Sequence, residues 1–235
     1  MAGKLILFPV PIGGDDIESV LPAANKALLD SCATFIVEEL RTARRFLKRA
    51  GYCRAIDDTE FFLLNEHTSD SEVAHYLDAV SRGENVGLLS EAGLPCIADP
   101  GRLVTHLAQS RGIEVVPLVG PSSLLLALMG SGLNGQRFAF RGYLPVNASE
   151  RAKTIRQLEQ RVMRDDETQL FIEAPYRNDH MMQSLVETLH PDTLICVACE
   201  LTMPTQYLRT LSALQWQVQG LPSLNKRNTV FLIGR

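Results

Sequence analysis

Three glycine- and proline-rich segments follow apolar runs of the chain, and their composition suits the binding of a small molecule by main-chain groups. They are Phe8–Gly14, Ser90–Gly101 and Gly120–Ser123. Glycine lets a backbone approach a ligand closely, and proline fixes φ, so such loops are shaped in advance. Each segment alone is typical of an ordinary turn between a strand and a helix, but three together favour a ligand site.

The apolar runs before these segments predict buried strands. We expect the loops at Gly93 and Gly120 to end adjacent parallel strands. Ligands bind open α/β sheets at the edge where such strands end. The sequence contains neither a Walker A pattern nor G-x-G-x-x-G, so a nucleoside triphosphate or a nicotinamide dinucleotide is not the favoured ligand.

A cluster of cationic side chains in a helix-like segment is a second candidate functional site. Spacings of three, four, seven and eight residues place five of them on one helix face: Arg41, Arg44, Arg45, Lys48 and Arg49. This face is explained equally well as a phosphate-binding patch or as a solvated surface beside Glu38 and Glu39.

Strands and helices that position these residues alternate in the first half of the chain. Short buried strands are predicted at 4–8, 33–37, 85–89 and 113–117. Helices are predicted between them, near 20–31, 41–50, 69–82 and 100–111. This alternation predicts a parallel sheet with helices on both faces.

The pattern changes from Arg137, where strand-like runs dominate. Strands are predicted at 137–143, 168–173, 193–200, 206–211 and 229–234, with helices near 149–162 and 177–189. These elements predict a second α/β domain with a mixed sheet. The expected organisation is therefore an N-terminal α/β domain over 1–118, a linker over 119–136 and a C-terminal domain over 137–235.

Composition indicates a globular protein, because 46% of the 235 residues are hydrophobic. Residues 1–135 carry 11 basic and 17 acidic side chains and residues 136–235 carry 12 and 10. The broad basic footprint of a nucleic-acid binder is therefore missing from the sequence. Without a signal pattern or a bilayer-length apolar stretch, we expect a cytoplasmic protein with no membrane partner.

The five cysteines are odd in number and offer one close pair, Cys196 and Cys199, in an apolar run. A reduced, buried pair is the favoured interpretation over a redox or zinc site, and no metal is expected.

A series of segments matches, in order, the pattern of a known family. The segments are Pro9–Gly13, Val37–Arg45, Asn65–His67, Ser90–Gly101, Gly120–Ser123, Ser131–Leu133, Arg137–Pro145, Phe171–Arg177, Glu200–Thr202 and Thr229–Gly234. On these motifs the chain resembles the tetrapyrrole (corrin/porphyrin) methylase superfamily of S-adenosylmethionine-dependent methyltransferases. Within it, the chain resembles most the branch of ribosomal-RNA ribose 2′-O-methyltransferases.

The resemblance implies a two-domain tetrapyrrole-methylase-like fold, a homodimer and a cofactor site to which both domains contribute. The residues that it implies for S-adenosylmethionine are Gly93, Leu94, Pro95, Ile97, Ala98, Gly120, Ser122, Ser123, Glu173, Ala174 and Thr229. For the acceptor it implies Pro11, Gly13, Arg41, Arg44, Arg45 and Arg177, the last as an anchor for its loop or for an anionic substrate.

Methyl transfer to a ribose hydroxyl needs a group that takes up the hydroxyl proton. Glu39 and Glu91 are candidates. At both positions the RNA-modifying branch usually has Asp, in Glu-Asp-Thr-Arg and Ser-Asp-Ala-Gly-Thr-Pro, so the carboxylate here lies one methylene further out. Glu66, His67 and Glu173 are further candidates near family-like motifs. For each of them, a structural role as a hydrogen-bond acceptor is the alternative.

The sequence leaves three functions open. The first is methylation of a ribose 2′-hydroxyl in ribosomal RNA. The second keeps S-adenosylmethionine but takes a tetrapyrrole or corrin ring, or another small acceptor, which the acidic net charge favours. The third is a catalytically silent cofactor-binding module, in which Glu39 and Glu91 mark lost activity.

Overall fold

The computed structural model describes residues 2–14, 16–65 and 68–235, and the chain divides after Ser122 into two compact units. The division lies within the stretch 118–136, where the sequence changes character. Each unit contains one sheet and its own hydrophobic core.

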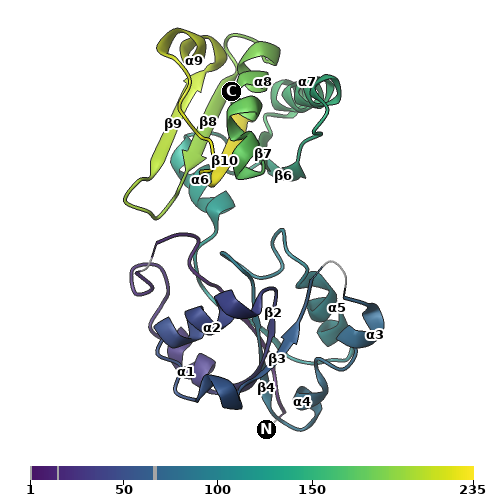
Figure 1. Ribbon diagram of the computed structural model, residues 1–235. Coiled ribbons are helices and arrows are strands. Elements are labelled where there is room, and N and C mark those ends of the chain that lie inside the picture. The colour runs from purple at the N-terminus through teal and green to yellow at the C-terminus, as the bar shows by residue number, and fades with distance from the viewer. Residues whose placement is uncertain (1, 15, 66–67) are drawn as a thin grey trace. The chain divides into compact units, whose positions relative to one another are not determined.

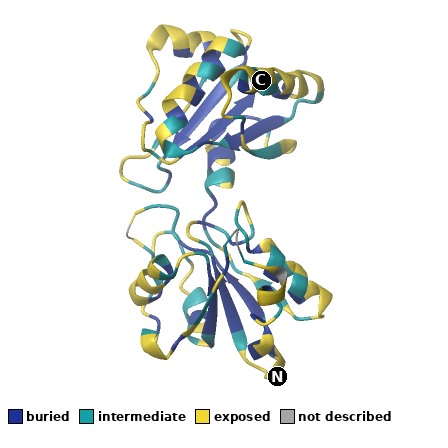
Figure 2. Cartoon of the chain, turned by 45° about the vertical axis from the view of Figure 1, so that its right-hand side comes forward, coloured by how far each residue is buried: buried dark blue, intermediate teal, exposed yellow. Residues whose placement is uncertain are grey.

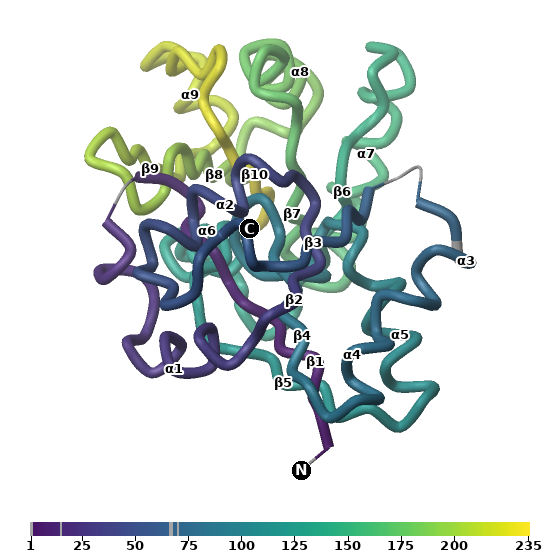
Figure 3. The backbone as a smooth tube through the Cα atoms, turned by 60° about the horizontal axis from the view of Figure 1, so that its bottom comes forward, coloured from purple at the N-terminus to yellow at the C-terminus, as the bar shows by residue number. Residues whose placement is uncertain are grey.

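The first unit is built on a five-stranded sheet in which every pairing is parallel. Its strands are β1 (Leu5–Phe8), β2 (Cys32–Val37), β3 (Glu60–Leu63), β4 (Asn85–Leu89) and β5 (Val115–Pro117). Their order is β3-β2-β4-β1-β5, and the view in Figure 3 shows β5, β1, β4 and β2 in succession. The predicted parallel sheet is confirmed. Strand β3 was not predicted, because it is a short edge strand whose sequence alternates little in polarity.

Helices cover both faces of this sheet, as predicted (Figure 1). They are α1 (Asn25–Asp30), α2 (Leu40–Arg49), α3 (Asp70–Val73), α4 (Asp78–Ser81) and α5 (Arg102–Ser110). Leu29, Ala43 and Leu47 of α1 and α2 pack on one face, and residues of α3, α4 and α5 pack on the other. Figure 2 shows the strands of this unit as its buried layer.

The single helix predicted at 69–82 is wrong, since two short helices occupy this stretch. Between them Tyr76 stacks on Phe62, with ring centroids 4.8 Å apart, and its hydroxyl donates a hydrogen bond to the Leu63 carbonyl. Backbone bonds here connect residues three apart, as in a 3₁₀ turn. Anchoring the tyrosine to β3 thus breaks the regular helix.

The second unit holds the predicted mixed sheet, in the order β6-β7-β10-β8-β9. Its strands are β6 (Phe138–Tyr143), β7 (Thr168–Ile172), β8 (Leu194–Cys199), β9 (Tyr207–Ser212) and β10 (Thr229–Gly234). Only β6 and β7 pair in parallel.

Three helices, α7 (Ala148–Asp165), α8 (Asn178–Thr188) and α9 (Ala213–Gln219), share a core with one face of this sheet. Helix α6 (Ser123–Ser131) lies within the stretch expected as a linker and packs on β8, β9 and β10. Helix α9 was not predicted, although Ser212 and Gln215 form a capping box that marks its start.

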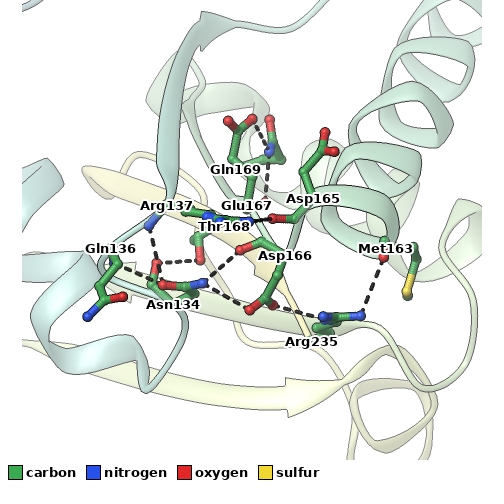
Figure 4. Close-up of polar contacts among 10 residues, drawn as sticks. All are labelled: Asn134, Gln136, Arg137, Met163, Asp165, Asp166, Glu167, Thr168, Gln169 and Arg235. Atoms are coloured by element: carbon green, nitrogen blue, oxygen red, sulfur yellow. Dashed lines mark hydrogen bonds and ion pairs between the residues drawn. The ribbon is translucent and has the colours of Figure 1, made fainter.

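Polar contacts join the end of α7 to the flanking strands (Figure 4). The Asn134 amide donates to the carbonyl and carboxylate of Asp166, at 2.8 and 3.0 Å, and Arg235 Nε donates to the same carboxylate at 2.9 Å. Asp166 ends α7 in a left-handed conformation, with φ 53°. Its hydrogen bonds from Arg235 and Asn134 lower the pKa of the carboxyl.

All five cysteines are free thiols. Cys196 and Cys199 are buried on β8, and their odd spacing directs them to opposite faces of the sheet. Burial raises the pKa of Cys32 to about 12. Within the described ranges, no helix is long and apolar enough to cross a membrane.

Candidate functional site

The candidate site of the first unit is the sheet edge where its parallel strands end. Strand β1 ends at Phe8, β4 at Leu89 and β5 at Pro117, so the three glycine- and proline-rich loops leave from one edge. The expected adjacency of β4 and β5 is wrong, because β1 lies between them. After β4 the chain crosses over through α5 to β5 on the far side of β1, so these two strands flank β1.

The loops after β1 and β4 are joined to each other. Val10 and Gly93 exchange two backbone hydrogen bonds, 2.9 and 3.1 Å long, in an isolated antiparallel bridge. Gly93 has a φ of 79°, which favours glycine, and a Cβ here would lie 3.2 Å from Ile12. The glycine therefore permits the approach of the two loops.

The loop after β4 has an unusual backbone at two residues of the predicted cofactor segment. Cys96 and Ala98 adopt φ values of 69° and 62° without being glycine. The Asp99 carboxylate holds this shape, since its Oδ1 accepts hydrogen bonds from the N–H groups of Cys96 and Gly101, both 2.8 Å long. Burial raises the pKa of Asp99. Such conformations persist where the surroundings fix them, and they cluster at ligand sites.

Gly120 allows a different close approach. A Cβ at this position would lie 2.2 Å from Cβ and 2.3 Å from Cγ of Pro9, in the loop after β1. The φ of Gly120 lies outside the positive region, so its backbone conformation does not require glycine. The residue is required for contact between two loops. The neighbouring Ser122 is buried, and Ser123 opens α6.

The carboxylates predicted as bases have different surroundings. Glu39 is the N-cap of α2 and accepts hydrogen bonds from the N–H groups of Arg41 and Thr42 and from the Thr42 hydroxyl. The hydrogen bond from the Thr42 side chain is the main cause that lowers the Glu39 pKa. Glu91 is exposed. Glu66 and His67 lie outside the described residues.

Glu38 is a carboxylate that sequence reasoning missed. It follows β2 directly and is half-buried. Its Oε2 accepts the N–H of Glu91 at 3.4 Å, and burial, with the nearby charges of Glu91 and Asp99, raises its pKa. A carboxylate with a raised pKa at a ligand-binding edge is a candidate proton acceptor. Its place at the end of a predicted strand, beside the Arg-rich helix, was the available signal.

The five predicted cations of α2 are all exposed, while Ala43 and Leu47 face the core. Arg44 lies over the ring of Phe61, at 5.5 Å from the ring centroid. Arg45 and Arg49 line a cavity of about 130 Å³ together with Pro11, Ser90 and Glu91. We call this the edge cavity. It brings predicted substrate residues of the β1 loop and α2 to the loop that follows β4. Gly13 lies in the same β1 loop.

The second unit gathers its predicted residues at one edge as well. Ile172, at the end of β7, pairs with Val230 of β10, so Glu173, Ala174 and Thr229 lie close together. The buried Glu173 carboxylate accepts hydrogen bonds from Arg177 Nε at 3.0 Å and Nη2 at 2.6 Å, and from the N–H of Ala174. Arg177 therefore anchors this loop, and the Glu173 carboxylate is occupied by hydrogen bonds within the loop.

Two buried polar atoms at this edge have no hydrogen-bond partner among the described residues, Asn178 Oδ1 and Thr202 Oγ1. The Asn178 amide nitrogen donates to the Arg227 carbonyl at 2.6 Å, and the Thr229 hydroxyl donates to that carbonyl at 3.1 Å. Thr202 has a φ of 68°. Buried polar atoms normally have partners, so these two atoms mark this edge as a candidate ligand site.

Comparisons with known proteins identify the family of this chain. The sequence model of the family described as Tetrapyrrole (Corrin/Porphyrin) Methylases matches residues 12–215. The Ribosomal RNA small subunit methyltransferase I of Pseudomonas aeruginosa is 30% identical over 210 residues, which are 89% of this chain and 70% of that protein. The protein of that name from Xylella fastidiosa is 30% identical over 98% of this chain and 81% of its own length.

Solved structures show the same fold. The methyltransferase CobJ has a TM-score of 0.65 at 17% identity, with 100% of this chain and 95% of CobJ covered. The cobalt precorrin-4 methyltransferase CbiF has a TM-score of 0.58 at 15% identity, over 98% and 94%. The fold predicted from the sequence is thereby confirmed.

Proposed function

This chain belongs to the tetrapyrrole (corrin/porphyrin) methylases and is a methyltransferase, and we propose that it transfers the methyl group of S-adenosylmethionine to a ribose 2′-hydroxyl of ribosomal RNA. The observation that carries the proposal is the juxtaposition at the first sheet edge. Backbone-rich loops, a half-buried carboxylate and a cationic helix face meet there.

The residues present fit S-adenosylmethionine. In the first unit, the main chain of Gly93–Ala98, with its left-handed conformations at Gly93, Cys96 and Ala98, offers N–H and C=O groups to a ligand. In the second unit, the unpartnered oxygens of Asn178 and Thr202 lie at the edge of Ala174 and Thr229. When bound, this cofactor supplies a methyl group on a positively charged sulfur.

The protein's own part in the reaction is to align the acceptor, exclude water and take up one proton. We assign the proton to Glu38, because Glu39 is occupied as a helix cap and has a lowered pKa. Glu91 supports Glu38 through its backbone N–H. The cations of α2 bind phosphates next to the acceptor nucleotide.

We also propose that the protein is a cytoplasmic homodimer. Helix α6 is apolar along most of its length, yet Leu125 and Met129 are 46% and 79% exposed. A helix that is hydrophobic around its circumference is normally buried. A second copy of the chain would cover these side chains.

Calorimetric titration with S-adenosylmethionine and its demethylated product, followed by methyl transfer to small-subunit ribosomal RNA, tests the function. We expect binding and transfer to RNA ribose. Transfer to a tetrapyrrole ring instead would support the small-acceptor alternative, and binding without turnover on any acceptor would support a silent module. Failure of both compounds to bind at millimolar concentration would overturn the cofactor assignment.

A further inference from the structure

A second, larger cavity lies in the first unit, beside the end of β1. Its volume is about 540 Å³, within the range of small-molecule sites. The segment 17–29 and the second half of α2 form its walls with β1. Most of the lining is apolar or aromatic, and it includes Phe8, Ile17, Leu21, Leu29 and Phe46. We call this the apolar cavity.

Polar groups are few in this lining. Lys26 is paired with Asp30, and the Asn25 amide donates to the Val119 carbonyl at 3.1 Å. Glu18 and Arg49 complete the charged lining. The cavity therefore offers a wide apolar surface with polar groups at a few positions, which suits a flat, partly polar ring.

The apolar cavity and the edge cavity share two side chains, Phe46 and Arg49. The edge cavity also includes Ser90 and Glu91, whose N–H binds the Glu38 carboxylate. A ligand that reaches through both cavities would thus extend from the proposed proton acceptor to the aromatic wall.

Charge complementarity identifies the class of ligand. The shared wall belongs to α2, whose exposed face carries Arg41, Arg44, Arg45, Lys48 and Arg49. An uncharged lipid or an apolar peptide would leave this face unused. A nucleotide matches both features, because its phosphates suit guanidinium groups and its base can stack on the partly exposed ring of Phe46.

We propose that the apolar cavity receives the base of the acceptor nucleotide, extruded from its RNA strand, while the ribose lies in the edge cavity. This inference rests on the proposed function. An enzyme must expose a reacting nucleotide that is stacked in folded RNA, and a pocket that stacks the base compensates for the lost stacking.

Two variants, in each of which one alanine is replaced by phenylalanine, test the proposal. Ala23 is exposed and lines the apolar cavity, whereas Ala27, on α1, is also exposed but does not line it. In Ala23→Phe the new ring fills the cavity, and kcat/KM for small-subunit ribosomal RNA should fall about tenfold or more, the loss expected for one stacked base. Ala27→Phe should keep the original value. Affinity for S-adenosylmethionine should stay the same in both variants.

Nucleoside monophosphates provide a readout that does not depend on turnover. Saturation-transfer NMR at millimolar concentration should show transfer to base protons with the original protein and with Ala27→Phe, and none with Ala23→Phe. Phe46→Leu, which keeps an apolar wall but removes the aromatic face, should weaken this signal.

The outcomes separate the two proposals. Equal RNA methylation by Ala23→Phe and the original protein, or base-proton signals that survive the filling of the cavity, would overturn the base pocket alone. If the original protein binds nucleotides in this manner but never methylates RNA, the proposed function fails and the pocket stands. Absence of nucleotide binding in the original protein also overturns the pocket.

Discussion

At the residue scale, two neighbouring glutamates have pKa values that are shifted in opposite directions. Glu38 is half-buried, and its pKa is raised by burial, whereas Glu39 receives hydrogen bonds from α2, and its pKa is lowered. A carboxylate with a lowered pKa is a weak base, and one used as a cap is not free to move. The local surroundings therefore assign different roles to the two side chains.

Glu38→Gln should lower kcat for methyl transfer by about a hundredfold or more, the usual contribution of a proton acceptor. Because Glu38 must be ionised to accept a proton, and its pKa is raised above 4.5, kcat of the original protein should fall as pH decreases through that raised pKa. The variant should lack this acidic limb. Glu39→Gln is the matched control and should keep it. An unchanged pH profile in Glu38→Gln would remove Glu38 from the mechanism.

Gly120→Val should abolish binding of S-adenosylmethionine, because the new side chain would overlap with Pro9 and displace the loops after β1 and β5. Calorimetry would measure the affinity, and circular dichroism would check the fold. Gly135→Val is a suitable control, since a Cβ at Gly135 meets nothing within 4 Å. If folded Gly120→Val binds the cofactor as well as the original protein, the loop is an ordinary turn.

At the element scale, helix α2 combines three properties. Its start is capped by Glu39, its inner face is fixed in the core by Ala43 and Leu47, and its outer face carries the cations. A phosphate-binding surface needs this rigidity, because freely moving side chains would lose more entropy on binding.

Changing Arg44 and Arg45 together to Ala should weaken RNA binding and reduce the slope of log affinity against log salt by about one for each phosphate that is no longer bound. Gel shifts over a salt series would measure both effects. Arg209→Ala, on the exposed surface of the second unit, serves as the comparison. RNA affinity that does not respond to the double change would favour a small acceptor instead.

Apolar periodicity predicted most strands and the long helices, because their buried faces repeat regularly. It missed β3 and merged α3 with α4, where one tertiary contact of Tyr76 decides the local structure. Local sequence patterns do not determine the order of strands in a sheet either. The position of β1 between β4 and β5 is therefore known only from the structure.

The loops of the candidate site were evident from glycine and proline, but the environment of each carboxylate was not. A sequence does not reveal that Glu39 accepts hydrogen bonds from its own helix while Glu38 lies against the loop after β4. Motif resemblance directed attention to Glu39 and Glu91, and burial directs it to Glu38. Side-chain burial and hydrogen bonding arise only after distant segments have packed.

At the scale of the whole molecule, the exposed apolar side chains of α6 predict self-association. Light scattering after size-exclusion chromatography should give twice the mass of the 26.0 kDa chain. Met129→Glu should shift the protein toward the monomer, because a charge in an apolar interface is costly. Gln219→Glu, at the end of α9, should not. A monomeric original protein would exclude the dimer.

The position of β1 between β4 and β5 also has a consequence for biosynthesis. Leu5–Phe8 pair only with residues 86–89 and 115–117, so this apolar segment has no partner when it leaves the ribosome. At 5–20 residues per second, the wait for β4 lasts roughly 4 to 16 s. During this time the nascent chain exposes one of its most hydrophobic strands, and shielding by a chaperone would protect it until the sheet closes.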